Sequence, residues 1–172
     1  MEGVIIPESF SFPFTPITIR GHTVIRPYVP TKIRYKNRSF NTHLLVDSGA
    51  DYSMLRKEVA EFLGIDLSKL KRTGLTSGIG GKPVPTSYVV CEIEINYKNR
   101  KIIEDIPFQI ILDDKSDPEI NILGRIPFFY DHRVDFRMGF TDSKTLGKFV
   151  IYKEDKKRKA SKFKEPLSFV KE

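Results

Sequence analysis

LLVDSGADYSML, residues 44–55, is an apolar run that leads into a single carboxylate and then into a turn of small residues. Its first three residues are apolar without interruption, which is typical of a strand buried on both faces. The run ends at Asp47, whose charge is costly to bury without a partner. Ser48 supplies a hydroxyl, Gly49 permits dihedral angles that other residues avoid, and Ala50 leaves space above the carboxylate. The stretch therefore predicts one acid presented to a cleft.

Two later stretches of the sequence have patterns that bear on the role of this acid turn. TSGIGGK, residues 76–82, is glycine-rich and precedes residues 87–96, in which apolar and polar residues alternate. This order predicts a hairpin with a mobile tip. INILGRIPFF, residues 120–129 and called here the ILGR stretch, is an apolar run broken by Gly124, and its Pro127 stands where a short helix can begin.

In this order, the three stretches resemble the retropepsin-like, or retroviral-type, aspartic proteases, and a predicted helix after the acid turn is similar to their cellular and prokaryotic branch. The resemblance covers residues 31–140 and identifies residues 76–82 as the flap. It implies a mainly β fold, an acid-protease half-barrel with a flap hairpin and one or two short helices. Because each chain of this family supplies one Asp-Thr/Ser-Gly turn, a chain with a single such turn implies a two-fold homodimer.

The resemblance also implies roles for individual residues. Asp47 of each chain would form a catalytic dyad that activates water against a polypeptide substrate, which defines an aspartic endopeptidase. Asp51 and Arg125 would form an ion pair beside the site. The residues of the active-site turn are Ser48, Gly49 and Ala50, and those implied to contact substrate are Asp51, Gly78, Ile79, Gly80, Gly81 and Ile126. No metal and no organic cofactor is implied.

Ordinary interpretations of the same residues stay open. Asp47 alone is compatible with a buried acid that caps a turn, and Asp51 and Arg125 with two unrelated surface charges. A phosphate-binding role for the glycine-rich stretch is disfavoured, because a strand pattern and not a helix follows it. For the whole protein, the alternative to an endopeptidase is a non-cleaving module of the same fold that dimerises or binds peptides.

Around the core the chain divides into further segments. Residues 1–30 are expected to be an N-terminal arm. Residues 1–16 show no strand period and are expected to pack in extended form on the domain or on a dimer mate, with disorder as the alternative. Residues 17–20 and 23–26 are expected to be short strands. Ser53 is the predicted N-cap of a helix over residues 54–63 that Gly64 ends. Residues 141–152 are a predicted C-terminal strand segment, in which residues 148–152 pair with residues 133–137 across a loop over residues 139–147. Residues 153–172 are a basic, flexible tail.

Charge and cysteine content suggest the compartment and the partners. Residues 153–164 hold seven basic and two acidic residues and so supply +5 of the net charge of +7. A solvated tail is the expected role, with nucleic-acid binding as the alternative. The single cysteine, Cys91, excludes an internal disulfide and fits a reducing compartment. No apolar run reaches membrane-spanning length and the N-terminus lacks a signal-peptide pattern, so we expect a cytoplasmic protein with no membrane contact.

Overall fold

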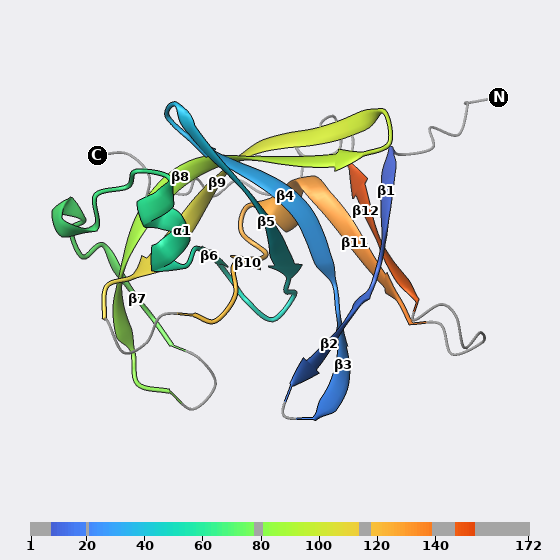
Figure 1. Ribbon diagram of the computed structural model, residues 1–172, viewed down its shortest axis with the longest axis horizontal. Coiled ribbons are helices and arrows are strands. Elements are labelled where there is room, and N and C mark those ends of the chain that lie inside the picture. The colour runs from blue at the N-terminus through green and yellow to red at the C-terminus, as the bar shows by residue number, and fades with distance from the viewer. Residues whose placement is uncertain (1–7, 20, 78–80, 114–117, 139–146, 154–172) are drawn as a thin grey trace.

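The structure is a computed structural model that describes residues 8–19, 21–77, 81–113, 118–138 and 147–153 of the chain (Figure 1). The described part is mainly β with two short α-helices, as predicted. The elements are β1 (Ser9–Pro13), β2 (Thr15–Ile19), β3 (His22–Arg26), β4 (Tyr28–Tyr35), β5 (Arg38–Val46), β6 (Ser53–Met54), α1 (Lys57–Phe62), the 3₁₀ helix η1 (Leu67–Lys69), β7 (Gly74–Thr76), β8 (Val84–Tyr97), β9 (Arg100–Ile111), β10 (Ile122–Leu123), α2 (Phe128–Asp131), β11 (His132–Arg137) and β12 (Lys148–Lys153).

The largest sheet curls back on itself. Its strand order is β4-β5-β10-β6-β9-β8-β7, and β4 also pairs with β8, where Ile33 lies opposite Ile93. This second pairing closes six strands into a barrel and leaves β7 at the edge. Inside, β8 follows the predicted alternation, because Val89, Cys91 and Ile93 point into the core. Burial raises the pKa of the Cys91 thiol to about 12.

The predicted helix after the acid turn begins later than expected. Ser53 is not its N-cap, since Ser53 and Met54 form β6 and pair in parallel with β9. Helix α1 starts at Lys57, after Arg56, which makes no side-chain cap hydrogen bond. Strand pairing with distant partners therefore outweighs the local capping preference of serine. The predicted stop is confirmed, because Gly64 has a φ of +78°, a conformation that favours glycine at a helix C-terminus.

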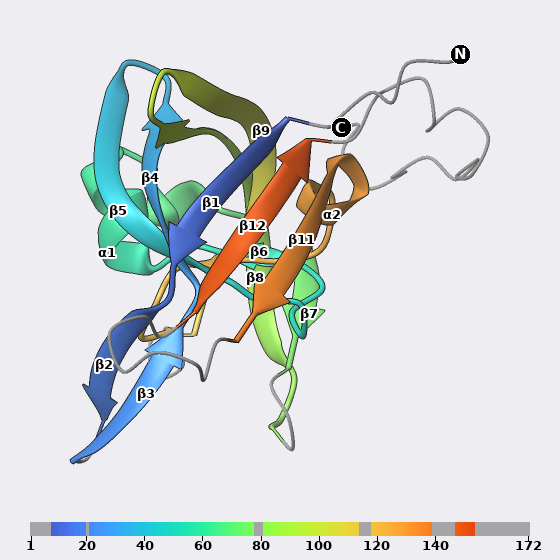
Figure 2. The same ribbon diagram turned by 90° about the vertical axis from the view of Figure 1, so that its right-hand side faces the viewer.

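A second sheet of three strands, in the order β1-β12-β11, packs beside the barrel (Figure 2). The predicted pairing of residues 133–137 with residues 148–152 is confirmed by β11 and β12. The prediction that residues 1–16 lack a strand period is wrong at residues 9–13, which form β1, because Phe10 and Phe12 alternate with serines and are buried. Phe10, Phe12 and Phe149 are buried, and the rings of Phe12 and Phe149 stack at a centroid distance of 5.5 Å. The N-terminal segment thus completes the core.

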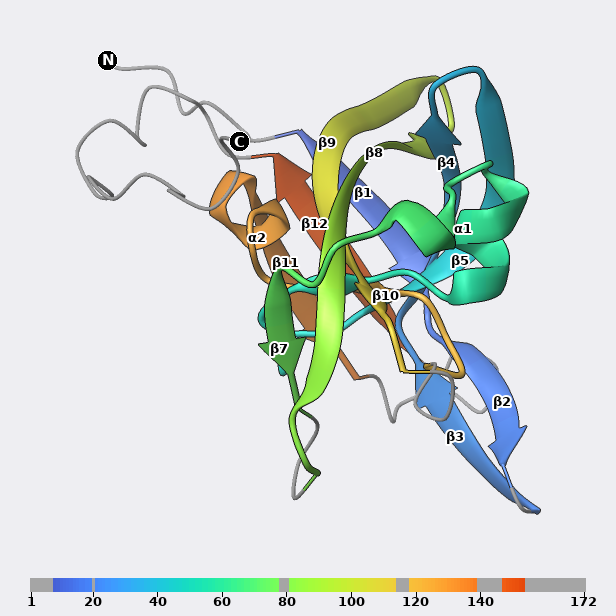
Figure 3. The same cartoon turned by 90° about the vertical axis from the view of Figure 1, so that its left-hand side faces the viewer.

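Strands β2 and β3, predicted as short strands, form a separate two-stranded sheet. In Figures 1, 2 and 3 this hairpin projects from the same end of the molecule as β7 and the first part of β8. Helices α1 and α2 lie on different sides of the barrel strands (Figure 3). Within the described residues, no helix is long and apolar enough to cross a membrane.

Truncating the aromatic core of β1 tests whether the N-terminal segment belongs to the fold. Phe10 has no exposed surface, so Phe10→Ala is expected to lower the free energy of unfolding by about 3–5 kcal/mol. Phe62→Ala is the matched control, because Phe62 is 57% exposed and its loss is expected to cost about 1 kcal/mol or less. Urea unfolding measures both, and equal losses would contradict the role assigned to β1.

His132 gives the fold a pH dependence. Its ring is buried and stacks on Phe128, and Nδ1 lies 3.0 Å from the Phe128 carbonyl oxygen. Burial lowers the pKa of His132 below 6.5, while that hydrogen bond and the carboxylate of Glu104 oppose the shift and Lys153 adds to it. As the pH falls below about 6.5, the unfolded chain therefore binds a proton that the folded chain binds only at lower pH, and stability declines.

We expect the wild type to lose stability between about pH 7.5 and pH 5.5, with a contribution from His132 of at most about 1.4 kcal/mol. His132→Gln should remove that contribution and so flatten the dependence of the free energy of unfolding on pH. His43→Gln, at an exposed position, should leave the slope unchanged. Urea titrations at the two pH values provide the comparison, and identical slopes in wild type and His132→Gln would refute the assignment.

Candidate active site

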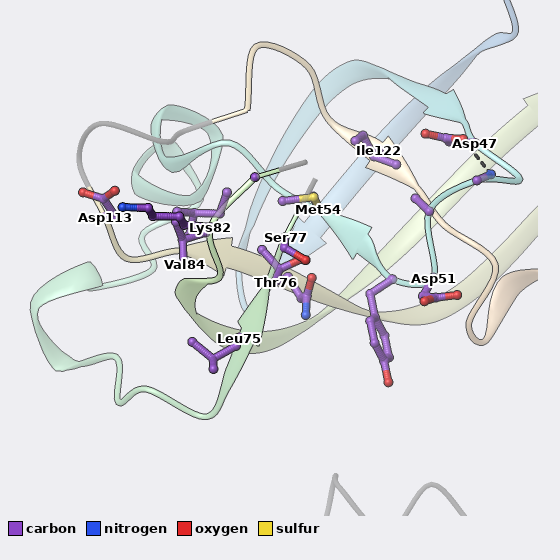
Figure 4. Close-up of a pocket in the computed structure, with 16 residues that line it drawn as sticks. Asp47, Asp51, Met54, Leu75, Thr76, Ser77, Lys82, Val84, Asp113 and Ile122 are labelled. Atoms are coloured by element: carbon purple, nitrogen blue, oxygen red, sulfur yellow. Dashed lines mark hydrogen bonds between the residues drawn. The ribbon is translucent and has the colours of Figure 1, made fainter. Parts of the chain in front are cut away.

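Strand β5 delivers Asp47 to the surface, and backbone hydrogen bonds hold it there. The Asp47 N–H donates to the Leu123 carbonyl at 3.0 Å, which continues the parallel pairing of β5 with β10. Beyond it the chain turns, and the Ala50 N–H donates to the Asp47 carbonyl at 3.3 Å. The Gly49 N–H donates to Asp47 Oδ1 at 2.8 Å (Figure 4). One carboxylate oxygen is thereby oriented by the turn that follows it.

The ILGR stretch holds the acid turn from the other side. The Arg125 N–H donates to the Ala50 carbonyl at 2.9 Å, and the Ile126 N–H donates to the Asp51 carbonyl at 2.8 Å. The Gly124 N–H donates to Ser53 Oγ at 3.1 Å, which gives this buried hydroxyl a different role from the predicted helix cap. Backbone groups of the consecutive residues 123–126 thus bond to the chain both before and after the acid turn.

Gly124 lies so close to the chain after the acid turn that no side chain fits. A Cβ atom at position 124 would lie 2.4 Å from the carbonyl carbon and oxygen of Tyr52 and 2.9 Å from the Ser53 nitrogen. At Gly49, a Cβ atom would lie 3.2 Å from Asp47 Oδ1, which is tighter than ordinary van der Waals contact. Both glycines therefore serve close approach of the backbone.

A cleft of about 1000 Å³ opens in front of the acid turn. In Figure 4, Asp47 and Asp51 lie at one end and Lys82 and Asp113 at the other. The lining residues come from the acid turn, β6, the two arms of the flap hairpin, β9 and β10. They are Asp47, Gly49, Ala50, Asp51, Tyr52, Met54, Leu75, Thr76, Ser77, Gly81, Lys82, Val84, Gln109, Ile111, Asp113 and Ile122.

The predicted flap hairpin forms one wall of this cleft. Strand β7 pairs with the start of β8, with Leu75 opposite Pro85 and Thr76 opposite Val84. Leu75 is 53% exposed, so its apolar side chain is available to a bound molecule. Gly81, which is predicted to contact substrate, is among the residues that line the cleft. The other predicted flap contacts, residues 78–80, lie outside the described residues.

The other predicted site residues are distributed unevenly. Arg125 and Asp51 form an ion pair, with their side chains 51% and 59% exposed in the single chain. Ser48 is exposed at the outer edge of the turn, and Ala50 lines the cleft. Ile126 is not among the described residues that line the cleft, and instead forms a bridge with Tyr52. Of the predicted residues, Asp47, Gly49, Ala50 and Asp51 therefore lie together in the acid turn, whereas Gly81 lines the cleft from the flap hairpin.

Sequence reasoning missed most of the cleft lining. Tyr52 packs edge-on against Tyr88 at 5.7 Å, and the Tyr88 hydroxyl accepts a hydrogen bond from Gln109 Nε2 at 2.6 Å. Burial raises the pKa of Tyr88. Asn121, another buried polar residue, accepts the Arg56 N–H through Oδ1 at 2.9 Å. In the sequence, Gln109 and Asn121 are polar residues within apolar segments. Such a polar residue indicates a buried side chain with a hydrogen-bond partner, and this signal could have identified both.

The described residues contain no group of three or more histidine, cysteine, aspartate or glutamate side chains arranged to hold a metal ion. Of the three aspartates among the described residues that line the cleft, Asp47 is the one whose carboxylate accepts a hydrogen bond from the backbone of the acid turn, and Asp51 pairs with Arg125.

Comparison with known proteins agrees with this arrangement. The family model for aspartyl proteases matches residues 29–125, which is more than half of the chain and includes the acid turn, the flap and the first part of the ILGR stretch. The chain belongs to the aspartyl protease family. Membership of the aspartic proteases, which the resemblance of the sequence implied, is thereby confirmed. No curated protein sequence matches the chain.

Among solved structures, the aspartyl protease chain is similar to a retropepsin-like aspartic protease from Rickettsia conorii. The two chains are 22% identical, the match covers 85% of this chain and 92% of the other, and the TM-score is 0.49.

Gly124→Ala tests the close contact that holds the acid turn. Because the added methyl group meets backbone atoms that cannot rotate away, we expect the free energy of unfolding to fall by about 3 kcal/mol. Gly21→Ala is the control, since its added Cβ meets no atom within 4 Å and only its φ of +79° opposes the change, at about 1 kcal/mol. Urea unfolding distinguishes the two, and a Gly124→Ala protein as stable as Gly21→Ala would exclude a steric role.

Proposed function

We propose that the protein is an aspartic endopeptidase whose active form is a homodimer, with one Asp47 from each chain. Family membership supports the reaction class. The observation that carries the proposal is the position of Asp47, which is held by the Gly49 N–H and faces a cleft walled by the flap hairpin. Because each chain offers only one acid turn, a second copy has to supply the second carboxylate.

In this mechanism the two carboxyl groups share one proton, because two like charges this close cannot both ionise. The ionised carboxylate takes a proton from a water molecule, whose oxygen bonds to the carbonyl carbon of the peptide. The protonated carboxyl group delivers its proton to the departing nitrogen as the carbon–nitrogen bond breaks. Water and a peptide bond thus yield a carboxyl and an amino terminus, and the proton assignment belongs to the pair and not to either residue.

The cleft fits an extended polypeptide as substrate. Its walls include strands β7, β8 and β9, whose backbone groups can pair with an extended chain, while alternate side chains enter pockets. Met54, Leu75 and Ile122 give the pockets an apolar character. Asp51 lies at the same end of the cleft as Asp47 (Figure 4), where it is proposed to face the substrate backbone. Its ion-pair partner is Arg125, and both side chains are exposed in the single chain.

Cleavage of a mixed peptide library, read by mass spectrometry at several pH values between about 4 and 7, tests this function. We expect cuts by the wild type, and a loss on the order of 1000-fold in Asp47→Asn, which keeps the shape of the side chain but removes the ionisable carboxyl group. Asp105→Asn, at an exposed position on β9, is the matched control and should cut like the wild type.

If neither the wild type nor Asp47→Asn cuts the library, while both bind peptides, the non-cleaving module is the correct interpretation. Equal cutting by the two proteins would instead indicate a contaminating protease. Nucleic-acid binding by residues 153–172 stays a separate prediction, because 154–172 lie outside the described residues. The cytoplasmic location expected from the sequence is likewise a proposal.

A further inference from the structure

The β2–β3 hairpin presents an apolar pair that no other described strand covers. Its register places Ile17 opposite Val24, and opposite residues of an antiparallel pair share one face of the hairpin. Both side chains are partly exposed. On the other face, Ile25 packs against the hydrophobic core of the same chain. One face thus docks on its own domain, while the face with Ile17 and Val24 is directed away from it.

An isolated two-stranded hairpin is only marginally stable in water. Strands β2 and β3 pair with each other and with no other described strand, although they extend well beyond the barrel in all three views (Figures 1, 2 and 3). The β-branched residues at positions 17 and 24 would gain stability if a partner covered them. The hairpin therefore has the properties of an element that is completed by association.

The base of the hairpin is joined directly to the catalytic strand. β3 ends at Arg26, and the carbonyl of the next residue, Pro27, accepts a hydrogen bond from the Val46 N–H at 3.0 Å. Val46 immediately precedes Asp47 in the chain. The position of the hairpin is thus fixed relative to the acid turn by contacts one residue away from the carboxylate.

The hairpin also projects in the direction from which a second copy would approach. In Figure 1 the arrowhead of β5, which leads into Asp47, points toward the end of the molecule from which both β2–β3 and the flap hairpin project. A two-fold axis that brings two Asp47 carboxylates together at this end would place the second chain between or against these two projections.

We propose that the β2–β3 hairpin is a dimerisation arm that packs its Ile17–Val24 face on a second copy of the chain and so holds the two Asp47 turns together. The inference rests on the proposed function, because the need for a second carboxylate identifies the occupant as another copy. The β2–β3 hairpin precedes residues 29–125, which match the family model, and its proposed role is to stabilise the active dimer.

Val24→Glu tests the arm, with Val90→Glu as the matched control. Val90 is a valine on the outward face of β8, 45% exposed, and receives the same change. Sedimentation equilibrium over a range of concentrations gives the dissociation constant of the dimer, circular dichroism checks folding, and peptide cleavage is measured in parallel. We expect Val24→Glu to raise the dissociation constant by about 100-fold, because a charge without a partner would be buried in the interface, and Val90→Glu to leave it unchanged.

Cleavage by folded Val24→Glu should fall in parallel with the dimer fraction and recover at higher protein concentration, which a purely local effect would not produce. Val24→Thr keeps the β-branched shape and replaces the test if Val24→Glu does not fold; its dissociation constant should rise by about tenfold. A folded variant that is as dimeric as the wild type would overturn the arm.

Three further outcomes are informative. Weaker cleavage without any change in mass would overturn the arm, because the hairpin would then contact substrate. A wild type that is monomeric at every concentration would overturn it as well, and would leave a segment of the same chain as the cover. If Val24→Glu is monomeric and the wild type is a dimer that does not cleave, the arm is supported while the proposed endopeptidase function fails.

Discussion

The contact between Gly124 and the backbone of Tyr52 is the constraint on which the site depends. Because no side chain fits between them, β10 can lie between β5 and β6. The N–H groups of Arg125 and Ile126, just after β10, can then donate to the acid turn. The Gly49 N–H holds one oxygen of the Asp47 carboxylate, and backbone hydrogen bonds to Leu123, Arg125 and Ile126 hold the turn that carries it. A carboxylate on an exposed turn is thereby tied to the strands of the barrel.

That rigidity contrasts with the rest of the cleft. Its floor is built from β6, β9 and β10, which are central strands, whereas one wall is the edge strand β7 with the beginning of β8. An edge strand is held on one side only, so its opening costs less free energy than a change in the floor. The barrel therefore combines a fixed acid with one wall that opens at a lower cost in free energy.

Sequence reasoning succeeded where the signal was local. The apolar run before Asp47, the alternation along residues 87–96 and the stop at Gly64 all depend on neighbours within a few positions, and the structure has each of them as expected. It failed at Ser53, because β6 is only two residues long and exists through partners on β9 and β10. β1 was missed since the prolines around Phe10 and Phe12 obscure a weak alternation, and Gln109 reaches the cleft only through the register of β9.

The pairing of β1 with β12 has a consequence for how the molecule is made. Ser9 lies opposite Tyr152, so the first described strand finds its partner in the last one, and Phe149 closes the core over residues near the N-terminus. Contacts between such distant positions form late. A nascent chain on the ribosome would thus expose the aromatic residues of β1 until β12 has emerged.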